Sequence, residues 1–443
     1  MSRMLVMRSG LFVLLLVYWC TTALAQSRLH IDIEKETAGD FLFPIAISKL
    51  LGEVAEPTLG QEIRGVLRQD LELTGLFRVM EAMNSEVPQA ADVLSYEHWS
   101  AVGAAAVIAG QMASAPGGGP LALRMVLHDI AARQIMDDRE YSGSRNQRRE
   151  MAHRFSNHVF QAFTGIEGPF DTRVLCVAPR RAGEKGKDIV LMDYDGYGPQ
   201  RLVADGALNI APLLSPDGNL LAYTSYRSGT PIIYLRNLKT AQEERITPGT
   251  GLALPGSWSS NNRYLALNQT VEGNSDIYLY DTQTKRFTRL TSDWGIDVSP
   301  SFSPDGSQIV FTSDRGGSPQ LYIMLAQSNG EARRLTFSGR YNTAPAWSPR
   351  GGRIAYVGTD TDGSLAVYTI GIDGQQLRRL ASGGRNYESP TWAPNGRFMM
   401  YTSKHGDVWQ RYMMREDGQA KLIPSGSGPS CFVSQWLQRI GPQ

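Results

Sequence analysis

A motif with a period of about 45 residues recurs five times between residues 210 and 403. Each copy opens with a proline and an apolar or aromatic residue, continues with a Ser-Pro-Asp-Gly-like turn, and ends in a short apolar run. The clearest copy is Pro300–Gly306 followed by Ile309–Ser313. Successive leading prolines are 43, 45, 45 and 45 residues apart: Pro212, Pro255, Pro300, Pro345 and Pro390. A period of this size built from short strands is typical of a β-propeller, in which each repeat forms one four-stranded blade.

The repeat is incomplete at both ends. Residues 172–203 have the pattern of three strands without a leading proline, and Pro429–Val433 resembles an inner strand with nothing after it. We therefore predict six blades, with the C-terminal strand completing the first blade. Closing the ring in this way leaves no unpaired sheet edge.

Two cysteines fall in this composite first blade. In a complete copy, the apolar residue of the inner strand lies nine positions before the aromatic residue of the second strand, as in Phe302 and Phe311. Aligning Pro429 with the leading prolines places Cys431 in the first slot and Cys176 in the second. We hypothesise a disulfide between them. The sequence does not fix the strand register, so the two side chains could also face opposite sides of the blade. The alternative is therefore two buried thiols that act as small apolar residues.

Residues 1–25 have the pattern of a secretory signal. Arg3 and Arg8 precede the apolar run Leu11–Trp19, and Ala23–Ala25 supplies the small residues that favour cleavage between Ala25 and Gln26. The apolar run is shorter than the roughly 20 residues that span a bilayer. We expect an exported, soluble mature chain; a retained membrane anchor is the alternative.

The segment before the repeats has mixed strand and helix patterns. Ile63, Val66, Leu67 and Leu71 follow helical spacing, residues 121–130 and 134–141 indicate a strand pair, and a helix is predicted over residues 147–163. We predict a signal peptide over 1–25, an α/β domain over 26–165 and the propeller over 170–443. The predicted fold class is an α+β N-terminal domain followed by an all-β six-bladed β-propeller.

Charge and motifs give little support to catalysis or nucleic-acid binding. Removing Arg3 and Arg8 from the chain, whose formal charge is +1, leaves 42 basic and 43 acidic residues. There is no Gly-x-Ser-x-Gly nucleophile motif and no paired-histidine zinc spacing. We expect no cofactor and no metal, and we interpret the aspartates of the repeated turns, and of Asp193–Gly196 and Asp360–Gly363, as turn formers.

The predicted helix over residues 147–163 contains two histidines, and a cluster of arginines lies at its start. We expect His153 and His158 on the polar side of this helix. The cluster Arg145, Arg148 and Arg149 is interpreted as a solvated helix start, with a partner surface as the alternative.

Three motifs resemble the TolB family, the periplasmic propeller proteins of the Tol-Pal system. They are Phe163–Ile166 before the propeller, Asp193–Tyr197 in the first blade, and Phe311–Arg315 with Gln320–Tyr322 in the fourth. The resemblance covers essentially the whole mature chain. It implies a monomeric, non-enzymatic periplasmic adaptor that maintains outer-membrane integrity and supports constriction during cell division.

The resemblance also implies two partners. Members of this family bind the peptidoglycan-associated lipoprotein Pal at one propeller mouth, and TolA through their extreme N-terminus; other envelope proteins are further candidates. The TolA-type segment here comprises Gln26, Ser27, Arg28, Leu29, His30, Ile31, Asp32 and Ile33. Pal-facing loops would contain Gly251, Leu254 and Val298. The rival interpretation is a periplasmic propeller enzyme, or a small-ligand or metal binder, that uses the central channel.

Overall fold

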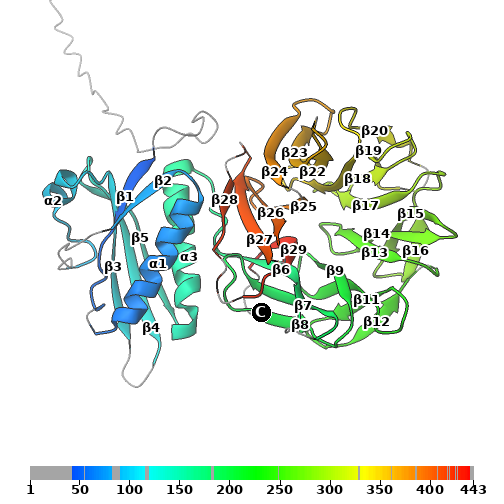
Figure 1. Ribbon diagram of the computed structural model, residues 1–443. Coiled ribbons are helices and arrows are strands. Elements are labelled where there is room, and N and C mark those ends of the chain that lie inside the picture. The colour runs from blue at the N-terminus through cyan, green and yellow to red at the C-terminus, as the bar shows by residue number, and fades with distance from the viewer. Residues whose placement is uncertain are drawn as a thin grey trace, which may run out of the picture.

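The computed structural model describes residues 42–439 apart from residues 54, 82–89, 115–118, 181–183, 248, 328–329, 361, 385–386, 407, 417, 419, 425 and 427. Figure 1 shows an α+β domain beside a ring of six sheets. This arrangement confirms the predicted fold class. The predicted signal peptide and the TolA-type segment lie outside the described residues. In the part of the chain that is described, no helix has the length and hydropathy of a bilayer span.

The α+β domain contains one five-stranded mixed sheet in the order β2-β1-β3-β4-β5. Its strands are β1 (Phe43–Ile47), β2 (Phe77–Glu81), β3 (Ala106–Ser114), β4 (Leu121–Asp129) and β5 (Gln134–Gly143). Strand β1 is parallel to β2 and β3, whereas β4 and β5 continue antiparallel. The helical elements are α1 (Pro57–Leu73), α2 (Tyr96–Ala101), the 3-10 helix η1 (Arg145–Gln147) and α3 (Arg148–Thr164).

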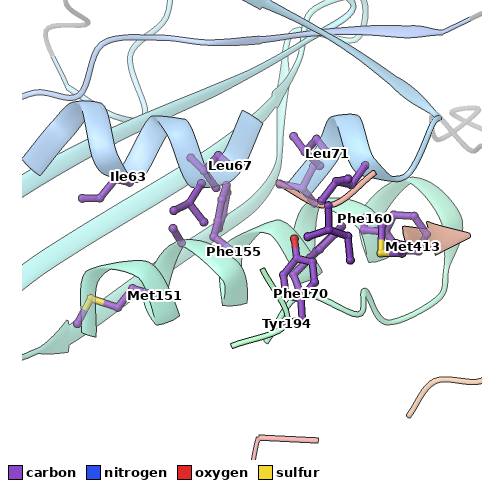
Figure 2. Close-up of a cluster of buried hydrophobic side chains, with 14 of the residues drawn as sticks. Ile63, Leu67, Leu71, Met151, Phe155, Phe160, Phe170, Tyr194 and Met413 are labelled. Carbon is purple, nitrogen blue, oxygen red and sulfur yellow. The ribbon is translucent and has the colours of Figure 1, made fainter. Parts of the chain in front are cut away.

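Helices α1 and α3 pack side by side on one face of this sheet because each presents an apolar stripe with helical spacing. The stripe of α1 includes Ile63, Leu67 and Leu71, and that of α3 includes Met151 and Phe155; all are buried in one cluster (Figure 2). Helix α3 ends at a glycine in the left-handed conformation, Gly165. Helix α2 covers the opposite face through Trp99.

The propeller consists of six antiparallel four-stranded sheets. Blade 1 contains β29 (Phe432–Gln438), β6 (Thr172–Pro179), β7 (Lys187–Asp193) and β8 (Gln200–Val203). Blade 2 contains β9 (Asn209–Leu214), β10 (Leu220–Ser225), β11 (Ile232–Asn237) and β12 (Glu243–Ile246). Blade 3 contains β13 (Ala253–Trp258), β14 (Tyr264–Val271), β15 (Asn274–Asp281) and β16 (Arg286–Arg289).

The remaining three blades follow the same order from the channel outward. Blade 4 contains β17 (Asp297–Phe302), β18 (Gln308–Ser313), β19 (Gln320–Leu325) and β20 (Arg333–Arg334). Blade 5 contains β21 (Asn342–Trp347), β22 (Arg353–Thr359), β23 (Leu365–Gly371) and β24 (Arg378–Gly384). Blade 6 contains β25 (Tyr387–Trp392), β26 (Phe398–His405), β27 (Val408–Arg415) and β28 (Ala420–Leu422).

The C-terminal strand β29 pairs with β6 and closes the ring, as predicted. Its register, however, differs from the predicted alignment. Trp436 pairs with Val174 in the way that Phe302 pairs with Ile309 in blade 4. The aromatic slot of the inner strand therefore holds Trp436, and the alignment that placed Cys431 there was wrong by five residues.

The error has a simple physical origin. The register makes Ser434 the counterpart of the leading prolines, and Pro429, which resembles them in sequence, lies five residues before it. The prediction for Cys176 is confirmed. Leu175 pairs with Gln435 in blade 1 as Val310 pairs with Ser301 in blade 4, so Cys176, the next residue, corresponds to the aromatic Phe311 of the second strand.

In the structure, Cys176 and Cys431 form a disulfide with their Cα atoms 5.9 Å apart. Cys431 immediately precedes β29, and both side chains are buried. The bond links segments 255 residues apart in sequence across the seam of the ring. It therefore joins the two ends of the propeller at the blade that only the C-terminal strand completes.

The propeller mouth and the domain interface as candidate sites

The inner strands of all six blades surround a central cavity of about 540 Å³. Its lining consists of apolar and neutral polar side chains, including the five leading prolines and, in blade 1, Ser434 and Gln435. Among the described residues no group of three His, Cys, Asp or Glu side chains is placed to hold a metal. The described residues of this lining include no carboxylate, imidazole or thiol side chain.

Two of the three predicted Pal-facing residues lie in strands and not in loops. Leu254 pairs with Asn268 within blade 3, and Val298 pairs with Thr312 within blade 4. Both are half-buried, and Leu254 lines the central cavity. Gly251 does lie in the turn before β13, where φ is +108° and a Cβ would clash with a backbone carbonyl. The loop assignment of Leu254 and Val298 was wrong because the ladder of each blade begins before its proline.

Within the described part of the propeller, most of the exposed large apolar side chains lie at one mouth. We call it the entry mouth. It is formed by the loops that lead into the inner strands and by the turns between the second and third strands of each blade. Both lie at the same end of the blade because its strands are antiparallel. Trp294 and Phe337 are 73% and 75% exposed, the largest values among the described large hydrophobic residues. Other exposed apolar residues of this mouth are Leu208, Val271, Ile296, Tyr341 and Val408.

Trp294 and Phe337 lie in the loops before the leading prolines, which were predicted to face a partner, but neither residue was among the predicted positions. The available signal was the presence of a large aromatic residue among Ser, Asp and Gly, in Ser292–Gly295 and in Phe337–Gly339. Neither side chain is buried, and the Phe337 ring has one contact with a charged group, the guanidinium of Arg334 5.0 Å from its centre. Exposed aromatic residues of this kind mark interaction surfaces.

The second candidate site is the interface between the two domains, where the prediction for His153 was wrong. His153 is fully buried, with its Nδ1 2.9 Å from Asp70 Oδ2 on α1 and its Nε2 3.4 Å from Asp195 Oδ2 on the propeller. Its partners come from elsewhere in the chain, so the spacing of polar residues along α3 gave no sign of them. His158 is partly exposed, and its Nδ1 lies 3.7 Å from Asp137 Oδ2.

The arginine cluster at the start of α3 is engaged in ion pairs and not only solvated. Arg145 pairs with Glu56, and Arg148 pairs with Glu62, both within the α+β domain. Arg149 instead donates to Asp195 of the propeller, and its guanidinium carbon lies 3.4 Å from the centre of the Tyr197 ring. The turn motif Asp193–Tyr197 is thus also a domain contact.

The charges in this interface stabilise one another. Burial by itself would lower the pKa of His153, but the carboxylates of Asp70 and Asp195 outweigh it and raise the pKa to about 10. Burial would raise the pKa of Asp195, but His153 and Arg149 lower it to about 2. Tyr194 donates a 2.5 Å hydrogen bond to Asp70 Oδ1, and burial followed by the nearby carboxylates raises the pKa of Tyr194. At neutral pH the interface therefore contains an imidazolium between two carboxylates.

Apolar packing surrounds these charges. Phe160 of α3 lies between Phe170 and Phe398, with ring centres 6.3 and 5.6 Å away. Phe170, Tyr194 and Met413 belong to the same buried cluster as the stripe of α1, as Figure 2 shows. The two domains therefore share one hydrophobic core and do not meet only through surface contacts.

Together these features define a two-domain propeller protein that has an apolar entry mouth and a packed α+β domain at its first and last blades. The model of the TolB beta propeller domain matches residues 160–430, and that of the TolB amino-terminal domain matches residues 29–136. The chain belongs to the TolB family of Tol-Pal system proteins.

Individual relatives agree with this assignment. The chain is 31% identical over 250 residues to the Tol-Pal system protein TolB of Pseudomonas fluorescens, covering 56% of this chain and 57% of the relative. It is 34% identical over 232 residues to that of Nitrosomonas europaea, covering 52% of each. The chain thus spans about half the length of the curated relatives it matches. The crystal structure of TolB from Acinetobacter baumannii has a TM-score of 0.79 and 27% identity, covering 90% of this chain and 98% of that one.

Proposed function

We propose that this protein is a non-enzymatic periplasmic adaptor of the Tol-Pal system that binds Pal at the entry mouth of the propeller. The observation that carries the proposal is the accumulation of exposed apolar side chains around that mouth, above a cavity whose lining is uncharged. A rigid ring with an apolar mouth is suited to binding a folded protein. Through this contact the protein would maintain outer-membrane integrity and support constriction at division.

The second partner in the proposal is TolA, bound through the segment Gln26–Ile33. Support comes from the sequence, in which Leu29, Ile31 and Ile33 alternate with polar residues, as in a strand that pairs with another sheet. The match to the amino-terminal domain model begins at residue 29, inside this segment.

A binding experiment with two deletion states tests the proposal. The mature chain, without residues 1–25, and a chain also lacking residues 26–33 would be mixed separately with the soluble domain of Pal and the C-terminal domain of TolA. We expect the mature chain to bind both partners and the shortened chain to bind only Pal. Absence of Pal binding by both chains would refute the adaptor function, and retention of TolA binding after the deletion would refute the role of the segment.

A further inference from the structure

Exposed aromatic residues on the entry mouth stand on loops that are held rigidly. The loop connecting β16 to β17 carries Trp294. The next amide, of Gly295, donates to Asp293 Oδ1 at 3.1 Å, and the amide of Ile296 donates to Asp314 Oδ1 at 2.7 Å. A Cβ on Gly295 would lie 2.7 Å from the backbone nitrogen of Arg315, so the loop packs closely on the neighbouring turn. The backbone that presents Trp294 is therefore fixed on both sides.

The loop that carries Phe337 is anchored by buried amides. Asn342, which begins β21 and is buried, donates from Nδ2 to Ser338 O at 2.7 Å and to Gln320 Oε1 at 2.8 Å. Gln320 is also buried and donates from Nε2 to Gly339 O at 3.1 Å. Buried side-chain amides are thus used to hold a loop whose most prominent side chain points into solvent.

The two loops lead into the inner strands of neighbouring blades, because β17 and β21 open blades 4 and 5. Blade 4 lies on the side of the ring away from the α+β domain (Figure 1). Arg340 lies in the second loop and is exposed; it lines a surface pocket with Asp360, which pairs with Arg379, and among the described residues no ion pair of Arg340 itself is found. A partner bound here would contact apolar surface and an exposed guanidinium, on a backbone that is already ordered.

We propose that Trp294, Ile296, Phe337 and Tyr341, which we call the aromatic rim, provide most of the binding energy for the protein partner of the entry mouth. The proposal rests on the proposed function, because it takes that partner to be the soluble domain of Pal. The partner places apolar side chains between the aromatic residues and a carboxylate against Arg340. Large aromatic residues on ordered backbone dominate protein interfaces, since little conformational entropy is lost when they bind. The predicted positions Leu254 and Val298, being half-buried, contribute less than the rim.

The test is isothermal titration of the mature chain with the soluble domain of Pal from the same organism. Trp294→Ala and Phe337→Ala should each weaken binding about 10-fold or more, as expected of hot-spot residues. Leu325→Ala is the matched control, because Leu325 is 47% exposed but ends β19 at the opposite mouth. The affinity of this variant for the soluble domain of Pal should stay within about twofold of wild type. Arg340→Glu should weaken binding and reduce its dependence on salt.

The outcomes separate this inference from the proposed function. If the wild-type chain does not bind Pal, the proposed function fails and the inference fails with it. If the wild-type chain binds and both alanine variants bind within twofold of it, the rim is refuted while the adaptor function stands. Melting temperatures should be unchanged because the substituted side chains are exposed; Trp294→Gln and Phe337→Gln provide a second pair should an alanine variant not fold.

Discussion

At the scale of single residues, His153 shows how one side chain can join two domains. It lies between Asp70 of α1 and Asp195 of the propeller, and it is fully buried. Arg149 and Arg411 add positive charge near Asp195, and burial lowers the pKa of Arg411 to about 10. A buried charge is tolerated only when it is paired, so each of these groups depends on the others.

We predict that His153→Gln lowers the free energy of unfolding by about 3–5 kcal/mol, because it leaves buried carboxylates without their imidazolium. Urea unfolding followed by circular dichroism measures the change. His158→Gln is the control on the same helix; its partly exposed side chain should change stability by less than about 1 kcal/mol.

The dependence on pH identifies the charge of His153 as the cause. The pKa of His153 in the folded protein is raised from 6.5 to about 10, so its stabilisation is fully present below pH 6.5 and is lost as the pH rises through 10. Wild-type stability should therefore fall more steeply than that of His153→Gln between pH 7 and pH 10. Parallel pH profiles of the two proteins would show that His153 contributes through packing alone.

At the scale of elements, strand β29 and the adjacent disulfide between Cys176 and Cys431 close the ring. Both sulfurs are buried, so a free thiol would escape alkylation in the native protein whether or not it were oxidised. The informative measurement is intact mass after alkylation in denaturant without reductant. We expect no label on the mature chain before reduction and two labels afterwards.

Loss of the disulfide has a predictable cost. Cys176→Ala with Cys431→Ala should lower the free energy of unfolding by about 2–5 kcal/mol, the usual effect of removing a native disulfide. Reducing the wild-type protein should bring its stability to that of the double variant. Equal stability of the oxidised wild-type protein and the double variant would contradict a structural role for the bond.

Elements were predictable from the sequence to the extent that their signal was local. The period of the prolines predicted five blades, and the sixth, composite blade followed from the two incomplete ends. The register of β29 was not predictable, because Ser434 stands where the other blades have proline. The charges around His153 were not predictable either, since Asp70 lies 83 residues away and meets it only in the folded protein. Trp294 and Phe337 could have been found, but only by asking why a turn contains a large aromatic residue.

At the scale of the whole molecule, the domain interface and the aromatic rim involve different blades of the ring. The α+β domain packs on blades 1 and 6, whereas the aromatic rim is on blades 4 and 5 (Figure 1). The shared core around Phe160 fixes the domain on the ring, so any conformational signal between the sites has to pass through the blades or their closing seam. Coupling of this kind requires an element with two arrangements that both sites influence.

The shared core predicts that the two domains unfold together. Phe398 is fully buried in β26 and contacts Phe160 of α3, so Phe398→Ala should remove about 3–5 kcal/mol and weaken the joint between the domains. Calorimetry should then resolve two transitions in place of one.

Phe311→Ala is the matched control: Phe311 is equally buried, but it lies in β18 of blade 4, away from the interface. It should lower the melting temperature while preserving a single transition. Two transitions in the wild-type protein would show that the shared core does not couple the domains.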